Sequence, residues 1–208
     1  NQEEALILRT FSNLKTEKEN RLADLIECSL QEATAIYLYN TILLNKNSWQ
    51  TSLQGQQRQV IQNVYSKRLS SQLSDTIAAS VIKEANAARL HTFFQGPDFL
   101  FFDNHGNFIG DHLKVVDEVI LKIRNTFLDG ATLEKELEQP PTGFTFGTVI
   151  SAMAALMRAG KIVAKYSGAE KFSWLDPGVV SIFSAAREFR KASFKAIAKS
   201  LTAQQKND

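Results

Sequence analysis

Basic side chains near the end of the chain recur at a spacing that could bind phosphate. Arg187, Lys191, Lys195 and Lys199 follow one another at intervals of four residues, with Arg190 beside them. Residues four apart share one face of a helix, so the spacing predicts a row of cations. Like charges at this spacing repel mildly, and a polyanion such as duplex DNA would relieve the repulsion. The alternative is a solvated face, or a face paired with acidic residues of the same chain.

A second group of cations falls on a predicted β-hairpin. Ile162 to Tyr166 and Lys171 to Leu175 are short β-favouring runs, and Ser167-Gly168 supplies a tight turn between them. The basic residues of this hairpin are Lys161, Lys165 and Lys171. Lysines on an exposed hairpin can contact phosphates, although they are also ordinary there.

Motifs that would indicate catalysis are missing. The sequence has no phosphate loop, no dinucleotide-binding glycine pattern, no nucleophile elbow and no paired-cysteine zinc motif. Asp103 to Asn107 resembles the start of a calcium loop, but Phe108 occupies the position that needs glycine. The histidines His91, His105 and His112 show no ligand spacing and are interpreted as surface or turn residues. We therefore expect no catalytic residue, no metal and no cofactor within this chain.

The elements that would position both basic groups form a recognisable order. Leu113 to Leu128 has helical apolar periodicity, and a short helix from Thr132 to Gln139 is ended by Pro140-Pro141. A turn through Gly143 and Phe144 leads to a longer helix that runs from Thr145 to Gly160. Helix, short helix, turn, third helix and hairpin is the order of a winged helix-turn-helix unit.

The third helix of such a unit usually reads the DNA groove. Once its apolar stripe is buried, the face that remains consists of Thr145, Thr148, Ser151, Ala152, Ala155 and Arg158. This face is poor in side chains that read base edges, so sequence-specific recognition is not expected. A protein-docking or structural role is favoured over non-specific DNA contact.

The remaining segments predict a mainly α-helical protein. Residues 2–46 read as one or two helices, and two more follow between Gln57 and Leu90, which suggests an antiparallel helical bundle over residues 1–95. A β-hairpin connector is predicted for residues 96–112. Residues 113–208 form the winged-helix unit, closed by a long basic helix from Pro177 to about Leu201.

Charge is unevenly distributed along the 208 residues. Residues 1–140 hold 14 Lys and Arg against 18 Asp and Glu, whereas residues 141–208 hold 10 against 4. This segregation points to the final third as the place to meet an acidic partner.

Other features bound the class of protein. No apolar run is long enough to span a bilayer and no secretory signal is seen, which predicts a cytoplasmic protein without membrane contact. The single cysteine, Cys28, excludes an internal disulfide and is expected to be buried in a helix. The chain opens on Asn1, and we expect it to be part of a longer polypeptide.

One stretch resembles a known family. Gln139-Pro140-Pro141-Thr142-Gly143-Phe144, and the helix that closes on Leu156-Met157-Arg158-Ala159-Gly160-Lys161-Ile162, are similar to the far-downstream region of the large P-loop ATPase of BREX phage-defence systems. The similarity covers about 45 residues, Gly130 to Trp174. It implies a non-catalytic region of a bacterial antiviral ATPase that acts with partner subunits, including a methyltransferase, to mark host DNA and block phage replication. ATP and Mg²⁺ would then bind elsewhere in the parent chain.

Three functional hypotheses follow. The first is a region of such an ATPase that docks other defence subunits and contacts duplex DNA non-specifically. The second is a free-standing winged-helix transcription regulator whose opening helices dimerise. The third is an enzyme with an unrecognised site around His105 and His112, which no acid/base pair in the sequence supports.

Overall fold

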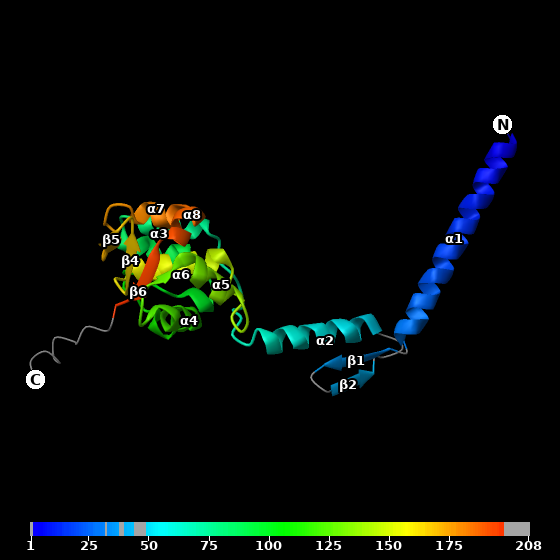
Figure 1. Ribbon diagram of the computed structural model, residues 1–208, viewed down its shortest axis with the longest axis horizontal. Helices are drawn as coiled ribbons and strands as arrows, with labels where there is room; N and C mark the ends of the chain where they lie inside the picture. Colours follow the sequence, from blue (N-terminus) through cyan, green and yellow to red (C-terminus); the bar gives the residue numbers. More distant parts are fainter. Residues whose placement is uncertain (1, 32, 38–39, 44–48, 198–208) are drawn as a thin grey trace, which may run out of the picture. The chain divides into compact units, whose positions relative to one another are not determined.

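The computed structural model describes residues 2–31, 33–37, 40–43 and 49–197. The chain divides by its internal contacts into two units, an N-terminal unit up to Val64 and a C-terminal unit from Tyr65. The protein is mainly helical with a small four-stranded antiparallel sheet (Figure 1). In the part of the chain that the structure describes, no helix has both the length and the apolar character needed to cross a membrane.

The described residues of the N-terminal unit form two helices and a pair of antiparallel strands. Helix α1 spans Gln2–Gln31, strands β1 (Thr34–Tyr37) and β2 (Asn40–Leu43) pair antiparallel, and α2 spans Trp49–Val64. The prediction of helix throughout residues 2–46 is wrong at Thr34–Tyr37 and Asn40–Leu43, while residues 32, 38–39 and 44–46 lie outside the described residues. Because β-branched and aromatic residues are concentrated in residues 34–43, this stretch favours extended backbone over helix.

The division after Val64 differs from the predicted boundary between residues 95 and 96. Helix α3 (Thr76–Lys83) belongs to the C-terminal unit, where its buried residues pack against α6 (Phe146–Arg158) and α7 (Val179–Ser184). Its buried side chains are those of Ala78, Val81 and Ile82. The short 3-10 segments η1 (Ala87–Phe93), η2 (Pro97–Phe99) and η3 (Gly110–His112) follow it.

Helix α6 is the centre of the C-terminal unit. Every residue from Gly147 to Met157 is buried. The helix begins as the sequence predicts, with the Thr145 hydroxyl accepting a hydrogen bond from the Thr148 amide, and Gly160 follows its end with a φ of 64°. Helices α4 (Lys114–Ile123) and α5 (Gly130–Glu138) pack against it (Figure 1).

The turn before α6 is held by long-range contacts. Gly143 has a φ of 65° and a Cβ there would lie 2.7 Å from the Tyr65 ring, so the turn and this contact both require glycine. The backbone carbonyl of Pro141 accepts from the Lys67 amide, and Phe144 is buried. Pro140 lies just beyond the end of α5, as the sequence predicts.

The sheet has the strand order β3-β6-β4-β5. Its strands are β3 (Leu128–Asp129), β4 (Ile162–Tyr166), β5 (Ala169–Lys171) and β6 (Ser193–Ala196). The predicted first strand, Ile162 to Tyr166, is confirmed as β4, and it pairs with β5 across a turn at Ser167-Gly168. The predicted second strand is misplaced, because β5 spans Ala169–Lys171 and residues 172–175 are not extended strand. The β-hairpin predicted for residues 96–112 is reduced to a turn at residues 103–107 and a single bridge between Phe102 and Phe108, because the 3-10 segments η2 and η3 occupy its two ends.

The predicted long C-terminal helix is wrong. Residues 177–197 form α7, α8 (Ala186–Lys191) and β6 instead. Ala185 and Ala192 have extended backbone, and each interrupts the helical run. Strand β6 is stabilised by pairing with both β3 and β4, an interaction between distant segments that helical periodicity does not register. Residues 198–201 of the predicted helix lie outside the described residues.

Candidate functional site: the apolar face of α1

Helix α1 exposes eight large apolar side chains. Their exposed fractions range from 45% at Leu14 to 70% at Leu8, and Phe11 is 66% exposed. The set comprises Leu6, Ile7, Leu8, Phe11, Leu14, Leu22, Leu25 and Ile26. Contiguous exposed apolar surface of this kind is typical of protein–protein interaction sites.

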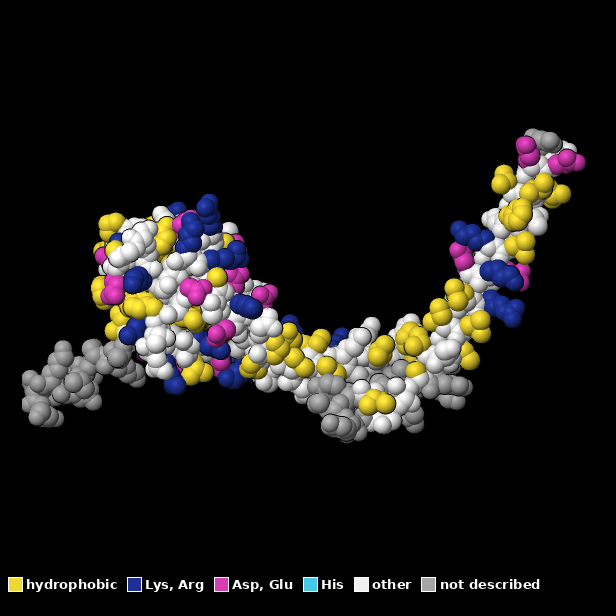
Figure 2. All heavy atoms as spheres, in the orientation of Figure 1, with side chains coloured by type: hydrophobic (Ala, Val, Ile, Leu, Met, Phe, Trp, Pro, Cys, Tyr) yellow, Lys and Arg dark blue, Asp and Glu magenta, His cyan; other side chains and the backbone are white. Residues whose placement is uncertain are grey.

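Most of these side chains share one face of the helix, which we call the α1 stripe. At 3.6 residues per turn, Ile7, Phe11, Leu14, Leu22 and Leu25 project in similar directions. Leu8 and Ile26 border the same face, whereas Leu6 points elsewhere. Figure 2 shows two apolar groups along α1, separated by a charged stretch.

The charged stretch runs from Lys15 to Arg21, in the middle of the helix. Lys15 and Glu19 form an exposed ion pair at 3.7 Å across one turn. Lys18 falls on the line of the stripe and is the main cation within it. The α1 stripe is therefore divided into two apolar clusters by a polar centre.

A helix with this face is marginal in isolation. Exposed helices gain most of their stability from packing an amphipathic face, because helix propensity alone adds little in water. Thr10 and Ser29 donate their hydroxyl protons to carbonyls one turn back, at 2.9 Å and 2.8 Å, which leaves the backbone ladder intact. The apolar clusters are thus the part of α1 that is incomplete without a partner.

Cys28 also lies on α1. It is exposed, so the prediction of a buried cysteine is wrong. The prediction assumed that the apolar neighbours Leu25 and Ile26 face a core of the same chain, and both are more than half exposed.

The predicted row of cations does not exist as a helical ladder. Arg187 and Lys191 lie on α8, Lys195 lies on β6, and Lys199 is outside the described residues. The change from helix to strand at Ala192 ends the four-residue alignment.

Several of the predicted phosphate-binding cations already contact carboxylates. Lys161 donates to both carboxylate oxygens of Asp111 at 3.0 Å, and Arg190 makes two hydrogen bonds to Glu134 at 2.7 and 2.8 Å. The Glu134 carboxylate raises the pKa of Arg190 above its ordinary value. Asp111 and Glu134 both belong to residues 1–140, where acidic residues outnumber basic ones. Folding therefore brings carboxylates from this part of the chain into contact with cations of the last third.

A third carboxylate lies among the basic residues of α8. Glu188 accepts from the Tyr166 hydroxyl at 2.6 Å and from Lys191 at 3.1 Å, while Arg187 lies 4.0 Å away and is 83% exposed. The hydrogen bond from Tyr166, followed by the one from Lys191, lowers the pKa of Glu188. Glu188 and Glu134 therefore offset two of the three positive charges of α8.

The remaining predicted cations belong to the sheet. Lys165 on β4 is exposed, Lys171 ends β5, and Lys195 lies 5.9 Å from the Phe127 ring centre. Within the described residues, none of the three has a carboxylate at ion-pair distance. They are the predicted site residues best able to meet an external anion.

The predicted outer face of the third helix is covered by the segment before α3. Thr148 donates to the Gln72 side chain at 2.7 Å and accepts from the Leu73 amide at 2.9 Å. Ser151 donates to the Ser74 carbonyl at 3.0 Å. A Cβ on Gly147 would lie 2.2 Å from the Leu73 carbonyl oxygen. The segment before α3 therefore covers this face of α6.

Arg158, at the end of that face, is also engaged. It donates to the Glu84 carbonyl at 2.7 Å and its guanidinium lies 3.3 Å from the centre of the Trp174 ring. Burial lowers the pKa of Arg158. It borders a hollow of about 420 Å³ that is otherwise lined mainly by apolar and aromatic residues.

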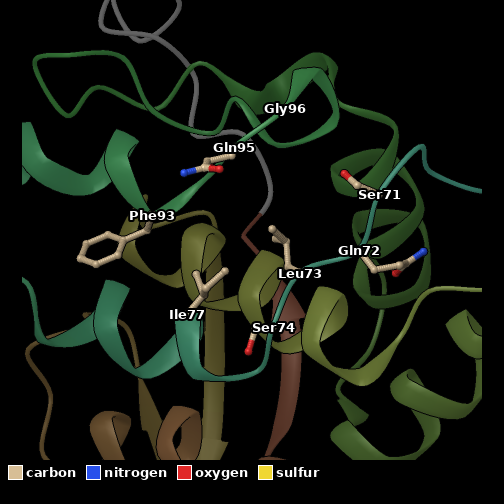
Figure 3. Close-up of a pocket in the computed structure, with 8 residues that line it drawn as sticks. All are labelled: Ser71, Gln72, Leu73, Ser74, Ile77, Phe93, Gln95 and Gly96. Atoms are coloured by element: carbon tan, nitrogen blue, oxygen red, sulfur yellow. The ribbon is translucent and has the colours of Figure 1, made fainter.

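The larger hollow of about 510 Å³ has no acid/base character. Figure 3 shows two segments facing across it, one with Ser71 to Ile77 and the other with Phe93 to Gly96. None of its lining residues is titratable, and the Gln72 side-chain oxygen already accepts hydrogen bonds from Thr145 and Thr148. The hollow offers no group that could activate a substrate.

The histidines stay apart from any metal-like cluster. His91 contacts the Ala88 carbonyl through Nδ1 at 2.8 Å, and His105 lies 4.0 Å from Asp103. His112 ends η3 and is exposed. Across the described ranges, no group of three or more His, Cys, Asp or Glu side chains could hold a metal ion.

Comparison with known families, curated proteins and solved structures found no match for this chain. The assignment of a function therefore rests on the α1 stripe and on the covered face of α6.

Proposed function

We propose that this chain is a non-catalytic protein-docking region that binds another protein chain through the α1 stripe. The observation that carries the proposal is the exposure of eight large apolar side chains on one helix, in a protein whose other unit buries its core fully. Soluble proteins rarely leave such a surface uncovered. The cores of interfaces are more apolar than the rest of the surface, and Phe, which the stripe contains at Phe11, is enriched in them.

The C-terminal unit supports the proposal as a winged-helix scaffold. We propose a winged-helix arrangement for this unit, and the order α4, β3, α5, α6 and the β4–β5 hairpin supports it, with β6 as an additional strand between β3 and β4. Because residues 147–157 of α6 are buried, this unit would serve as a structural or protein-docking module. The same burial disfavours a sequence-specific transcription regulator.

The resemblance to the BREX ATPase fits this reading. The Pro-Pro-Thr-Gly-Phe turn and the end of α6 that carry it are structural elements with buried contacts. We propose a region of a longer cytoplasmic defence protein in which ATP and Mg²⁺ bind elsewhere, and in which this region docks partner subunits. The full reading frame tests this directly, since a phosphate loop outside the chain is expected.

Docking can be tested by co-purification with the proteins encoded beside this one. Phe11→Asp places a charge in the α1 stripe, and Asn20→Asp adds the same charge on the opposite face. The expected result is a complex that Phe11→Asp abolishes and Asn20→Asp preserves, because a buried charge without a partner is strongly unfavourable. A complex that tolerates Phe11→Asp would contradict the proposal.

Non-specific contact with duplex DNA is a second candidate function. It is favoured by Lys165 and Lys195, which have no carboxylate at ion-pair distance within the described residues. Binding should weaken steeply with salt and further on Lys165→Glu with Lys195→Glu. Failure to bind duplex DNA at about 50 mM salt would exclude this candidate.

A further inference from the structure

The two apolar clusters of α1 are mirror images along the helix. The mirrored residues are Ile7, Leu8 and Phe11 in the first cluster and Ile26, Leu25 and Leu22 in the second, whereas Leu14, also in the first cluster, has Glu19 at its mirror position. Read from their outer ends, both have steps of one and then three residues, and the mirror point lies between Thr16 and Glu17. A two-fold interface needs such self-complementarity. If one residue contacts a second residue on the other copy, the second residue must also contact the first one there.

We propose that α1 pairs with α1 of a second copy of this chain in an antiparallel arrangement, about a two-fold axis beside Thr16 and Glu17. The inference rests on the proposed docking function and names the occupant of the α1 stripe. Phe11 then packs against Leu22 of the second copy, at the centre of the stripe. Two contacts flank this one. The mirror counterparts Ile7 and Ile26 lie on opposite borders of the stripe, so each residue instead meets the neighbour of its counterpart that lies on its own border, Ile7 with Leu25 and Leu8 with Ile26.

The directions of the side chains agree with these pairs. In an antiparallel pair related by a two-fold axis, one border of the stripe meets the same border of the second helix. At about 100° per residue, Ile7 and Leu25 point in the same direction, and so do Leu8 and Ile26. The contact between Ile7 and Leu25 and the contact between Leu8 and Ile26 can therefore form in the same arrangement of the two helices.

The polar centre also favours the antiparallel arrangement. Lys15 and Glu19 lie on the same border, and the two-fold axis brings Lys15 of one helix beside Glu19 of the other. In a parallel pair in register, each Lys18 on the stripe would face Lys18 of the second copy. In the antiparallel arrangement the two Lys18 residues lie about 4.5 Å apart along the direction of the helices. Their long aliphatic side chains can then carry the ammonium groups out to water.

The size of the surface suits a stable dimer. Helix α1 has 30 residues, which corresponds to a length of about 45 Å. Seven of its eight exposed large apolar side chains lie on or beside the stripe, and each is close to half exposed or more. A surface of this length approaches the roughly 800 Å² per partner of a specific interface. Homodimer interfaces are also the more apolar class, as this stripe is.

Sedimentation of the whole chain tests the pairing. Wild type is expected to show a concentration-dependent monomer–dimer equilibrium. Phe11→Asp and Leu22→Asp should each weaken it by more than about a hundredfold, because either change buries a charge at the centre of both symmetric contacts. Asn20→Asp, on the opposite face, should leave it unchanged. A wild-type chain that stays monomeric, or dimers that tolerate Phe11→Asp, would overturn the inference.

Disulfide trapping tests the direction of the pairing. In a Cys28→Ser background, a mixture of Phe11→Cys and Leu22→Cys chains should cross-link, because the two positions meet across the axis. Phe11→Cys alone should not cross-link to itself, since its two copies lie about 16 Å apart along the pair, beyond the reach of a disulfide. Efficient self-cross-linking of Phe11→Cys would indicate parallel helices and overturn the proposal.

These results separate the inference from the docking function on which it rests. If the chain is monomeric but its complex with a neighbouring protein is lost on Phe11→Asp, the α1 stripe docks a different protein and the self-pairing is wrong. If neither assembly depends on Phe11, both the inference and the docking function fail.

Discussion

Helices α1 and α4 carry the same kind of apolar pattern with opposite outcomes. In α4 the side chains of Val115, Val119 and Ile123 are fully buried, whereas in α1 Phe11 and Leu25 are 66% and 59% exposed. Both patterns predict a helix with one apolar face. The difference shows that periodicity identifies the face that needs a partner, without telling whether the partner belongs to the same chain.

The largest difference should appear when one phenylalanine is truncated in each region. Phe189 is fully buried against the rings of Phe146, Phe183 and Phe194. Phe189→Ala should lower the free energy of unfolding of the C-terminal unit by about 3–5 kcal/mol, because it leaves a cavity in the core. Denaturant unfolding followed by tryptophan fluorescence measures this change.

Phe11→Ala is the matched change in α1. It should alter the same unfolding transition by less than about 0.5 kcal/mol, because Phe11 is exposed in the single chain. Its effect should appear in association instead. A loss of several kcal/mol from the C-terminal unit on Phe11→Ala would mean that α1 packs against that unit.

A buried and an exposed threonine give the next contrast. Thr148→Val leaves the Leu73 amide and the Gln72 side chain without their shared hydroxyl partner, and should cost about 1–3 kcal/mol. Thr10→Val, on exposed α1, should change stability far less. Thermal unfolding of the two variants measures both effects. Equal effects would contradict the covering of α6 by the segment that precedes α3.

The N-terminal cap of α5, the helix that packs against α6, gives a smaller effect. Asp129 accepts hydrogen bonds from the Thr132 amide and hydroxyl, at 2.9 and 2.8 Å. Asp129→Ala should cost about 1 kcal/mol, whereas Asp129→Asn should retain most of the cap. Unfolding at neutral pH checks the pair, and an Asn variant as unstable as the Ala variant would show that the charge rather than the cap matters.

The same residue predicts a pH dependence. Its hydrogen bonds with Thr132, the backbone amide first, lower the pKa of Asp129 in the folded chain. Because the folded pKa lies below the unfolded one, this stabilisation is present above the unfolded pKa and is lost as the pH falls through the folded value. Wild type should therefore lose stability relative to Asp129→Asn below about pH 4. Parallel pH profiles of the two proteins would contradict this.

The smallest effects should come from surface ion pairs. Arg190→Gln removes the paired contact with Glu134, and Lys15→Gln removes the exposed contact with Glu19. The first should cost about 1 kcal/mol or less and the second should be close to zero, because exposed pairs are screened by water and salt. Unfolding in low and high salt measures both. A larger loss at Lys15 would show that α1 is not solvent-exposed in the free chain.

Local signals made part of the fold predictable. Pro140-Pro141 ends α5, Thr145 caps α6, and Gly160 and Gly168 provide turns that flank β4, so short-range geometry fixes these boundaries. Strand β6 could not be found this way. Its pairing with β3 and β4 joins residues far apart in sequence, and these tertiary contacts override the four-residue spacing between Lys191 and Lys195.

The candidate site shows the same limit. The apolar stripe of α1 is visible in the sequence as a periodic pattern, but the sequence does not show whether the stripe is exposed or buried. For this reason the pattern around Cys28 predicts a buried cysteine, whereas Cys28 is exposed. The partners of Lys161 and Arg190 lie 50 and 56 residues away, so the sequence could not show that these cations are neutralised. Charge counted along the chain overstates the charge that a partner would meet.

Hydrogen exchange of α1 in the whole chain, measured across protein concentrations, tests the central claim most directly. If the α1 stripe is satisfied between chains, amides of residues 2–31 should exchange quickly when dilute and become protected as concentration rises. Amides of α6, buried within one chain, should remain equally protected throughout. Protection of α1 that is already complete in the dilute monomer would contradict the account, because its apolar face would then be covered by its own chain.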